Sequence, residues 1–408
     1  MRVTIDRLGH LGDGLATVPE GTVFVPGVLP GEVVEGDLNA DKLTNVRIVT
    51  PSADRIKAPC PHARTCGGCQ LQHVADSFVE AWKASIVSSA LAAHGLPAPI
   101  KGVATSPPHS RRRAVFSARR TKSGVLIGFH ARSSVTLVAI PECRLLHPDL
   151  MDVVTGLQEL AMIGGSRSAE LSMTVTRSEA GADVAVTGGK PLDSELRMAL
   201  ARIVEKHQFA RLTWEGEVVA LRDSPIQRFG RAVVTPPSGA FLQATLEGET
   251  ALLDAVREAL GPQQRVADLF AGSGTFTFPI AEFAEVHSVE GDAAMIQALD
   301  KATRNTQGLR RITSETRDLF RRPLQPDELA RFSGVVLDPP RAGAEAQTRC
   351  LVLSTVPVVA MVSCNPITFA RDAGILVSAG YALDWIRVVD QFRWSTHVEL
   401  VARFSRPS

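Results

Sequence analysis

The sequence lacks several features that mark whole classes of protein. Its longest apolar run, 351–362, is much shorter than the roughly 20 residues that cross a bilayer, and it predicts a buried element instead. The N-terminus MRVTIDRLGH has no apolar segment typical of a secretory signal. We therefore expect a cytoplasmic protein with no membrane partner.

Net charge and cysteine are also scarce. A net charge of +1 over 408 residues does not indicate a polyanionic partner, which only a local basic patch could bind. There are only six cysteines, three of them clustered. In a chain of this size without a signal, a disulfide framework is not expected. A metal site and a catalytic thiol remain as explanations.

Hydrophobic patterning divides the chain into three expected domains. Residues 1–55 form short strands separated by Gly and Pro, which predicts a small β-barrel of the OB type. Residues 56–235 are strand-rich and predict a middle α+β domain; its helix over 77–94, ended by Gly95 and Pro97, could pack on the catalytic domain. In 236–408 apolar strands alternate with helices, which predicts an α/β fold with a doubly wound parallel sheet.

A glycine-rich turn in VADLFAGSGTF predicts a ligand site in the third domain. Gly272 and Gly274 follow a strand and precede a helix, which lets a ligand approach the backbone closely. Glu290 ends the next strand, where a carboxylate can accept hydrogen bonds from both ribose hydroxyls. Together they indicate a nucleoside cofactor, without distinguishing S-adenosylmethionine from NAD. The alternative is a tight turn with a surface glutamate.

The motif DPPR follows another strand of the predicted sheet. Two prolines cannot continue a central strand, so the chain must turn with Asp338 at the ligand-binding edge. Arg341 and Ala342 stand where methyltransferases of amino groups carry an aromatic residue. Methylation of an exocyclic nitrogen is therefore disfavoured.

Cys364, in VPVVAMVSCNP, ends the following strand at the same edge. A free cysteine is usually a small buried apolar residue, but its place between Ser and Asn before Pro366 makes it a candidate nucleophile. Glu399, in STHVELVARF, is the candidate general base, with His397 beside it. A single glutamate near a terminal strand is more often a solvated surface residue, and only the presence of Cys364 makes Glu399 the leading candidate.

A second group of cysteines predicts a metal site. Cys60, Cys66 and Cys69 have the spacing C-x5-C-x2-C, and Cys143 could complete four thiolates. Four thiolates suit either zinc or an iron–sulfur cluster. Zinc sites more often pair two CxxC motifs, and this sequence has only one, which argues against zinc. His62 and His73, however, are nearby alternative ligands that would favour zinc. The spacing leaves both metals open.

Taken in order, these motifs resemble the bacterial uridine-C5 RNA methyltransferases, most closely the 23S rRNA enzymes, over nearly the whole chain. The shared motifs are CPHARTCGGCQ, PEC, FLQ, DLFAGSGTF, VEG, DPPRAG, SCNP and HVE, after a TRAM-like barrel. The resemblance implies S-adenosylmethionine as cofactor, Cys364 as nucleophile, Glu399 as base, and a [4Fe–4S] cluster on Cys60, Cys66, Cys69 and Cys143. It also implies a cofactor site formed by Gln243, Phe270, Gly272, Thr275, Glu290, Asp318 and Asp338.

RNA would be the partner of such an enzyme, with the target uridine unpaired or flipped out of its stack. The barrel is a poor candidate for gripping phosphates, because residues 1–57 carry six Lys or Arg against eight Asp or Glu. The segment 111–122 is the better candidate, although it could be only a solvated strand edge. Its positive charges are Arg111, Arg112, Arg113, Arg119, Arg120 and Lys122.

Three other functions compete with this interpretation. A tRNA uracil-5 methyltransferase would share the same motifs. A nicotinamide oxidoreductase would explain the glycine turn and Glu290 but not Cys364 or the clustered cysteines. An RNA-binding protein with an inactive methyltransferase domain is opposed by the presence of both Cys364 and Glu399. We expect a monomer in each case.

Overall fold

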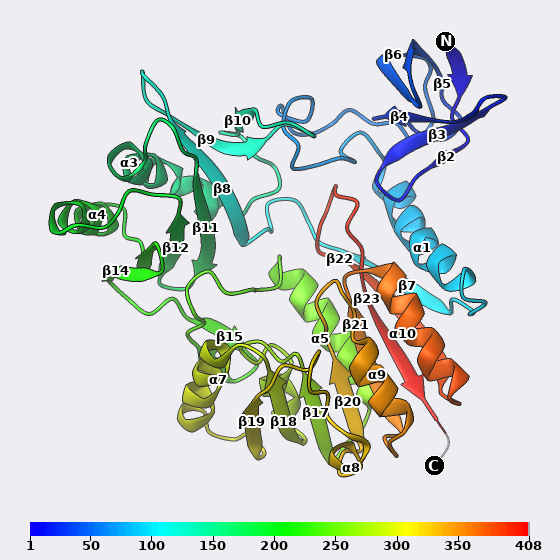
Figure 1. Ribbon diagram of the computed structural model, residues 1–408, viewed down its shortest axis with the longest axis vertical. Helices are drawn as coiled ribbons and strands as arrows, with labels where there is room; N and C mark the ends of the chain where they lie inside the picture. The colour runs from blue at the N-terminus through cyan, green and yellow to red at the C-terminus, as the bar shows by residue number, and fades with distance from the viewer. Residues whose placement is uncertain (407–408) are drawn as a thin grey trace.

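The computed structural model describes residues 1–406 and has three lobes (Figure 1). Residues 407–408, the last two of the expected third domain, lie outside the described residues. The first lobe is a curled six-stranded sheet in the order β1-β5-β6-β4-β3-β2, around a core that includes Val25, Val34 and Leu43. Its strands are β1 (Arg2–Thr4), β2 (Arg7–Leu8), β3 (Asp13–Val18), β4 (Gly21–Pro26), β5 (Val33–Asn39) and β6 (Lys42–Thr50).

Helix α1 (Asp76–Ala92) connects this lobe to the third one, and it confirms the predicted helix. It runs from the N-terminal sheet down beside α10 (Pro366–Ser378) (Figure 1). The Trp82 indole nitrogen donates to the Leu8 carbonyl oxygen at 3.3 Å. Further along the helix, Val87 and Leu91 are fully buried in the core of the third lobe.

The segment after α1 corrects one expected boundary. Strand β7 (Ile100–Thr105) pairs in parallel with β22 (Ala382–Asp390) and forms the edge of the C-terminal sheet. Residues 100–105 thus belong structurally to the third lobe, although we expected them in the middle domain. A parallel pairing between residues about 285 positions apart leaves no local sequence signal.

The middle lobe is a seven-stranded sheet in the order β10-β9-β8-β11-β12-β13-β14. Helices α3 (Val154–Gly164) and α4 (Ser194–Lys206) pack on it, and Trp214 is fully buried beneath them. A short helix, α2 (Pro148–Asp152), precedes α3. The strands are β8 (Arg113–Arg120), β9 (Val125–His130), β10 (Leu137–Ala139), β11 (Leu171–Ser178), β12 (Gly181–Thr187), β13 (Arg211–Trp214) and β14 (Glu217–Leu221).

The third lobe is an eight-stranded sheet covered by helices on both faces, in the order β19-β18-β17-β20-β21-β23-β22-β7. All neighbours are parallel except where β23 is involved. The predicted doubly wound α/β class is confirmed. Besides β7 and β22, the strands are β17 (Arg265–Leu269), β18 (Glu285–Glu290), β19 (Ile312–Thr316), β20 (Gly334–Leu337), β21 (Val358–Ser363) and β23 (Glu399–Ser405).

The helices divide between the two faces according to their apolar sides. The core of one face holds residues of α5 (Leu246–Leu260) and α6 (Thr277–Ala281). The core of the other face holds residues of α1, α8 (Pro326–Leu329), α9 (Glu345–Val352) and α10. Helix α7 (Ala293–Asn305) packs on the hairpin β15 (Gln227–Phe229) and β16 (Ala232–Val234).

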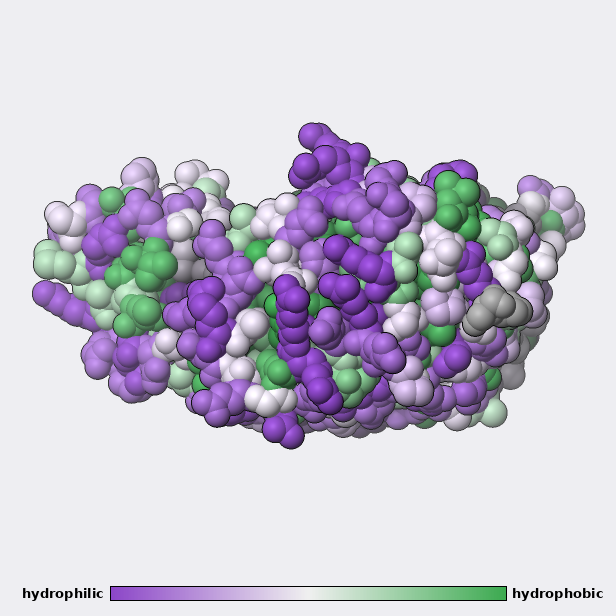
Figure 2. Space-filling view, turned by 90° about the horizontal axis from the view of Figure 1, so that it is seen from below, coloured by the Kyte–Doolittle hydropathy of each residue, from purple (hydrophilic) through white to green (hydrophobic). Residues whose placement is uncertain are grey.

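Strand direction decides where functional side chains gather. The parallel strands β17, β18, β20 and β21 all end at the edge facing the middle lobe, whereas the antiparallel β23 begins there (Figure 1). The opposite face is largely hydrophilic, with small separate hydrophobic patches (Figure 2). Within residues 1–406, no helix is long and apolar enough to cross a membrane.

Candidate active site

A pocket of about 1030 Å³ opens at this edge of the C-terminal sheet, between the third lobe and the cysteine-bearing loop. It is large enough for a nucleoside cofactor together with a base. The residues that we predicted from separate motifs meet in its lining: Phe270, Gly272, Glu290, Asp318, Asp338, Cys364 and Glu399.

The glycine turn after β17 forms one wall. Phe270 has φ 63°, a left-handed conformation that is rare for a non-glycine residue and is often found at functional sites. Gly274 has φ 99°, and a Cβ there would lie 2.5 Å from the Phe278 ring. Gly272 N donates to Glu290 Oε2 at 3.0 Å. This bond holds the Glu290 carboxylate beside the turn, where a ribose could reach it.

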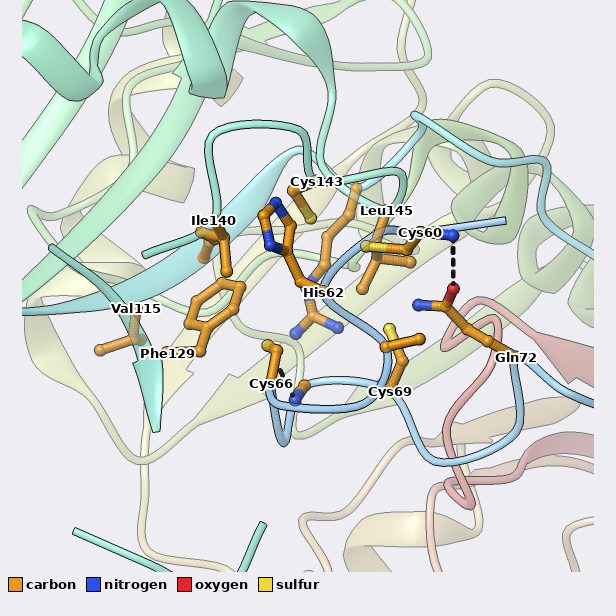
Figure 3. A pocket seen from close by; sticks show the side chains of 14 residues that line it. Cys60, His62, Cys66, Cys69, Gln72, Val115, Phe129, Ile140, Cys143 and Leu145 are labelled. Atoms are coloured by element: carbon orange, nitrogen blue, oxygen red, sulfur yellow. Dashed lines mark hydrogen bonds between the residues drawn. The ribbon is translucent and has the colours of Figure 1, made fainter. Parts of the chain in front are cut away.

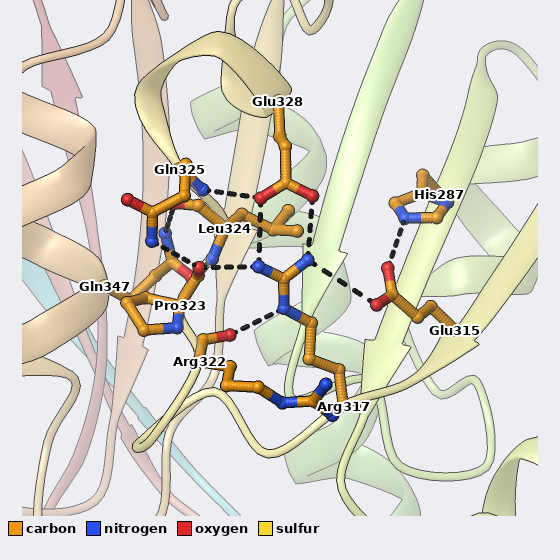
Figure 4. A network of polar contacts seen from close by, with 9 residues as sticks. All are labelled: His287, Glu315, Arg317, Arg322, Pro323, Leu324, Gln325, Glu328 and Gln347. Atoms are coloured by element: carbon orange, nitrogen blue, oxygen red, sulfur yellow. Dashed lines mark hydrogen bonds and ion pairs between the residues drawn. The ribbon is translucent and has the colours of Figure 1, made fainter.

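A half-buried ion pair supports the loop after β19 (Figure 4). Arg317 donates from Nη1 and Nη2 to the two Glu328 carboxylate oxygens at 2.8 and 2.9 Å. These hydrogen bonds lower the pKa of Glu328 to about 2. The pair fixes the loop after β19, which carries Asp318 and Phe320 into the pocket.

Phe320 was not predicted from the sequence. Its ring lies 5.4 Å from that of Phe270, at an interplanar angle of 56°. Two aromatic rings at a pocket wall offer an apolar surface for a flat heterocycle. The sequence signal that points to Phe320 is its position two residues after the predicted site residue Asp318. In the structure, Phe320 N donates to Asp318 Oδ1 at 3.0 Å.

Two carboxyl groups lie at the pocket floor: Asp338 lines it, and Asp268 is fully buried behind the lining residues. Burial raises the pKa of Asp268 to about 7, although Thr277 Oγ1 donates to its Oδ2 at 2.6 Å. Burial also raises the pKa of Asp338 well above its ordinary value, and the neighbouring charge of Glu399 adds to this effect. A cationic ligand group would relieve the repulsion among these carboxylates.

Cys364 follows β21 and is half-buried at the pocket wall. Burial raises the pKa of its thiol to about 11, the Glu399 and Asp338 carboxylates act in the same direction, and Arg341 opposes them. The Asn365 side chain caps α10 by accepting from Ile367 N, and its Nδ2 donates to the Arg341 carbonyl at 2.9 Å. The thiol therefore sits on a turn that is fixed on both sides.

Glu399 is the first residue of β23 and is 4% exposed. Burial raises the pKa of its carboxyl to about 7, partly offset by a hydrogen bond from Gln391. Gln391, which the sequence analysis missed, also donates to Gln243 Oε1 at 2.6 Å. Gln243 is thus buried behind the pocket wall, and Thr275, half-buried in the glycine turn, is not among the lining residues.

The four predicted metal-binding cysteines line a second pocket of about 240 Å³ (Figure 3). Burial raises the pKa of Cys66 and Cys143, and that of Cys69 to about 12. A Cβ at Gly67 would lie 2.8 Å from the Arg132 nitrogen and the His130 carbonyl oxygen, so the loop can approach the β9–β10 turn only with glycine there. Within residues 1–406, no three His, Cys, Asp or Glu side chains are arranged to hold a metal ion.

The two histidines considered as zinc ligands have other surroundings. His62 lines the cysteine pocket, where its Nε2 accepts from Glu142 N at 3.3 Å. His73 is not among the lining residues, and burial lowers its pKa to about 4. The donor set facing the pocket is therefore mainly sulfur.

Comparison with known proteins identifies the family. Residues 230–406 match the model of the tRNA (uracil-5-)-methyltransferases. The 23S rRNA (uracil(1939)-C(5))-methyltransferase RlmD of Shewanella sp. (strain ANA-3) is 31% identical over 98% of this chain and 94% of its own length. The chain belongs to the RNA (uracil-5-)-methyltransferase family.

Other relatives agree with this assignment. An uncharacterized RNA methyltransferase of Brucella suis biovar 1 (strain 1330) is 43% identical to this methyltransferase over 98% of the chain and 97% of the relative. The crystal structure of the Pyrococcus abyssi tRNA (uracil-54, C5)-methyltransferase with S-adenosyl-L-homocysteine covers 99% of both chains with a TM-score of 0.75. At 22% identity it shows the shared fold. Membership of this family overturns the nicotinamide oxidoreductase alternative.

The six basic residues predicted to contact RNA do not all face solvent in this methyltransferase. Arg112 is buried and donates to Glu249 Oε2 at 2.5 Å, and Arg113 donates to the Gly239 carbonyl. Arg119 pairs with Glu170 at 2.9 Å. Alternate side chains of a strand point to opposite faces, so Arg119 and Arg120 of β8 cannot share one surface. Arg111 lies between the two pockets and lines both, Arg120 is half-buried, and Lys122 is exposed.

Proposed function

We propose that this enzyme transfers the methyl group of S-adenosylmethionine to carbon 5 of a uridine in RNA, with Cys364 as nucleophile and Glu399 as base. The observation that carries the proposal is the meeting of Cys364, Glu399 and Asp338 at one pocket, although they come from three different strands. A thiol and a carboxylate are the two groups that methylation of this carbon requires.

The cofactor would occupy the wall formed by the glycine turn. Bound there, S-adenosylmethionine supplies an electrophilic methyl group on a positively charged sulfur. Glu290 is placed to accept hydrogen bonds from the ribose hydroxyls, and Phe270 and Phe320 offer apolar rings to the adenine. The carboxylates of the pocket floor favour the cationic sulfur.

Cys364 would begin the reaction, because carbon 5 of uracil is too weak a nucleophile by itself. Its thiolate, formed by loss of the thiol proton to water, adds to carbon 6 and places an electron pair on carbon 5. That pair forms the bond from carbon 5 to the methyl carbon while the bond from the methyl carbon to the cofactor sulfur breaks. Glu399 next removes the carbon-5 proton. The electron pair of that C–H bond forms the C5–C6 double bond, and the C6–S bond breaks to return the Cys364 thiolate.

The target is proposed to be 23S rRNA. Support comes from the rRNA-specific relative, which covers nearly the whole of this chain at 31% identity. A tRNA uridine is the second candidate, favoured by the shared fold of the Pyrococcus abyssi tRNA enzyme. The target uridine must leave its stack to reach Cys364. The TRAM-like nature of the N-terminal sheet and the cytoplasmic location stay predictions.

Cys60, Cys66, Cys69 and Cys143 are proposed to hold a [4Fe–4S] cluster. Four thiols facing one pocket provide the donor set that such clusters bind. The cluster would tie the loop 60–69 to Cys143 in the middle lobe. Gln70 N and Leu71 N both donate to the Trp394 carbonyl, so that loop also supports the active site.

Release of tritium from RNA labelled at carbon 5 of uridine tests this function directly. Replacement of the carbon-5 hydrogen should release one tritium for each methyl group transferred, and only with S-adenosylmethionine present. Methyl incorporation without tritium release would place the methyl group on another atom. Comparing 23S rRNA and tRNA as substrates, each from cells lacking the enzyme, would separate the two candidate targets.

A further inference from the structure

Gln391 occupies a central position among the buried polar groups behind the active site. It directly follows β22 and is 1% exposed. Its Nε2 donates to Gln243 Oε1 at 2.6 Å and to Glu399 Oε2, and its Oε1 accepts from Ala244 N at 2.7 Å. One side-chain amide thus joins the proposed base to two consecutive residues of the segment before α5.

Close packing fixes the backbone position from which this amide extends. A Cβ at Gly248, in the first turn of α5, would lie only 2.4 Å from Gln391 Cβ, so glycine is required at the point of contact. On the other side, Asp390 is held by a buried ion pair with Lys83. The backbone before Gln391 and the helix beside it are therefore both fixed.

We infer that Gln391 is a positioning residue for proton removal: its amide orients the Glu399 carboxylate and keeps it able to accept the carbon-5 proton. This inference rests on the proposed role of Glu399 as base. Because Oε2 accepts the amide hydrogen, Oε1 is left for the substrate proton. The same bond stabilises the ionised carboxylate in a site where burial favours its neutral form.

Burial makes this donor important, because it raises the pKa of Glu399 and the hydrogen bond from Gln391 opposes that effect. Asp338 follows β20 and Cys364 follows β21, both on the same side of β23, and besides burial the Glu399 charge raises the pKa of each. Asp338 and Glu399 are thus two neighbouring carboxyl groups, and burial raises the pKa of each. The other charged or titratable groups lining the pocket are Arg111, Glu290, Asp318, Arg341 and His397. Among these contacts, Gln391 is the group that donates a hydrogen bond to Glu399.

Two variants test the inference by different chemistry. Gln391→Met keeps the length of the side chain but removes both the donor and the acceptor. Gln391→Glu keeps the shape and the acceptor for Ala244 N, but places an oxygen against Glu399. Gln347→Met is the matched control: it removes another buried amide, which binds both the nitrogen and the carbonyl of Leu324 away from the pocket (Figure 4).

Single-turnover reactions with methyl-labelled S-adenosylmethionine and RNA would follow the methylated covalent adduct and its decay from pH 6 to 9. Both Gln391 variants should form the adduct, resolve it about 10- to 100-fold more slowly at neutral pH, and require higher pH for half-maximal decay. Gln347→Met should keep the wild-type pH profile. Binding of S-adenosylmethionine and the unfolding temperature would be measured for every variant.

The outcomes separate the inference from the proposed function. If both Gln391 variants bind the cofactor but resolve the adduct with the wild-type rate and pH profile, Gln391 does not position the base. A uniform fall in adduct formation and decay, shared with Gln347→Met, would show a purely structural effect and overturn the inference. If Glu399→Gln itself resolves the adduct normally, the base assignment fails, whatever the Gln391 variants do.

Discussion

Lys83 of α1 and Asp390 at the end of β22 form an ion pair inside the protein, with Nζ 2.6 Å from Oδ1 and side-chain exposures of 0% and 1%. Lys83 Nζ also lies 3.4 Å from the Phe392 carbonyl oxygen. Burial lowers the pKa of Lys83 and raises that of Asp390, while each charge counteracts the shift of the other. The pair joins the helix below the N-terminal sheet to the segment that leads to Glu399.

We expect Lys83→Met to lower the free energy of unfolding by about 3–5 kcal/mol, because it leaves the Asp390 charge buried without a partner. Denaturant unfolding would measure this loss. The double variant Lys83→Met/Asp390→Asn removes both charges and should recover most of the stability. Equal losses in the single and double variants would mean that the ion pair is not what the single variant disrupts.

Replacing the two proposed catalytic residues should stop the reaction at different stages. Glu399→Gln should accumulate a denaturant-stable adduct containing RNA and the transferred methyl group, because the base is needed only after methyl transfer. Cys364→Ala should form no adduct yet bind S-adenosylmethionine, since Glu290 and Asp338 are unchanged. Gel mobility of labelled RNA would show both results. Appreciable turnover by Cys364→Ala would mean that another thiol, with Cys350 first to examine, is the nucleophile.

The burial of Glu399 predicts a pH-dependent cost to folding. Folding raises the pKa of this carboxyl from 4.5 to about 7, so the folded form binds the proton more tightly than the unfolded chain. The cost is absent below about pH 4.5, grows as pH rises to about 7, and reaches about 3 kcal/mol above that. Glu399→Gln should therefore be more stable than the wild type at pH 8 and nearly equal to it at pH 4.5. A stability difference that does not change with pH would contradict this.

The sequence predicted the residues that follow the parallel strands, because Asp338 and Cys364 are placed by local features: an apolar run, its end and a turn. It did not reveal Gln391, whose partners Gln243 and Ala244 are about 150 residues away in the chain. It also misjudged segment 111–122, because a row of arginines does not show which of them the strand turns inward toward Glu249. Contacts between distant segments, such as β7 with β22, leave no periodic signal within either segment.

The cysteine pocket predicts iron in the purified protein. Material prepared without oxygen should be brown and contain about four irons per chain, since four thiolates are the usual ligand set of such a cluster. Cys143→Ser should lower the iron content and the unfolding temperature. Cys350→Ser is the control, because Cys350 is also half-buried but lies on α9, away from this pocket. Stoichiometric zinc without iron in the same material would rule out the cluster.

We expect Arg112 to stabilise the fold rather than to bind RNA. Its guanidinium donates to Glu249 Oε2 at 2.5 Å and to the Gln243 carbonyl at 3.1 Å, and it thereby joins the middle lobe to α5. Arg112→Met leaves the buried Glu249 carboxylate unpaired and should lower the free energy of unfolding by about 3–5 kcal/mol. Lys122→Met removes an exposed charge and should change stability by less than about 0.5 kcal/mol.

Because a phosphate contact adds nearly one unit to the salt dependence of binding, RNA titrations at several salt concentrations would distinguish the two roles. The slope should be unchanged for folded Arg112→Met, and a reduced slope would show that this arginine binds phosphate after all.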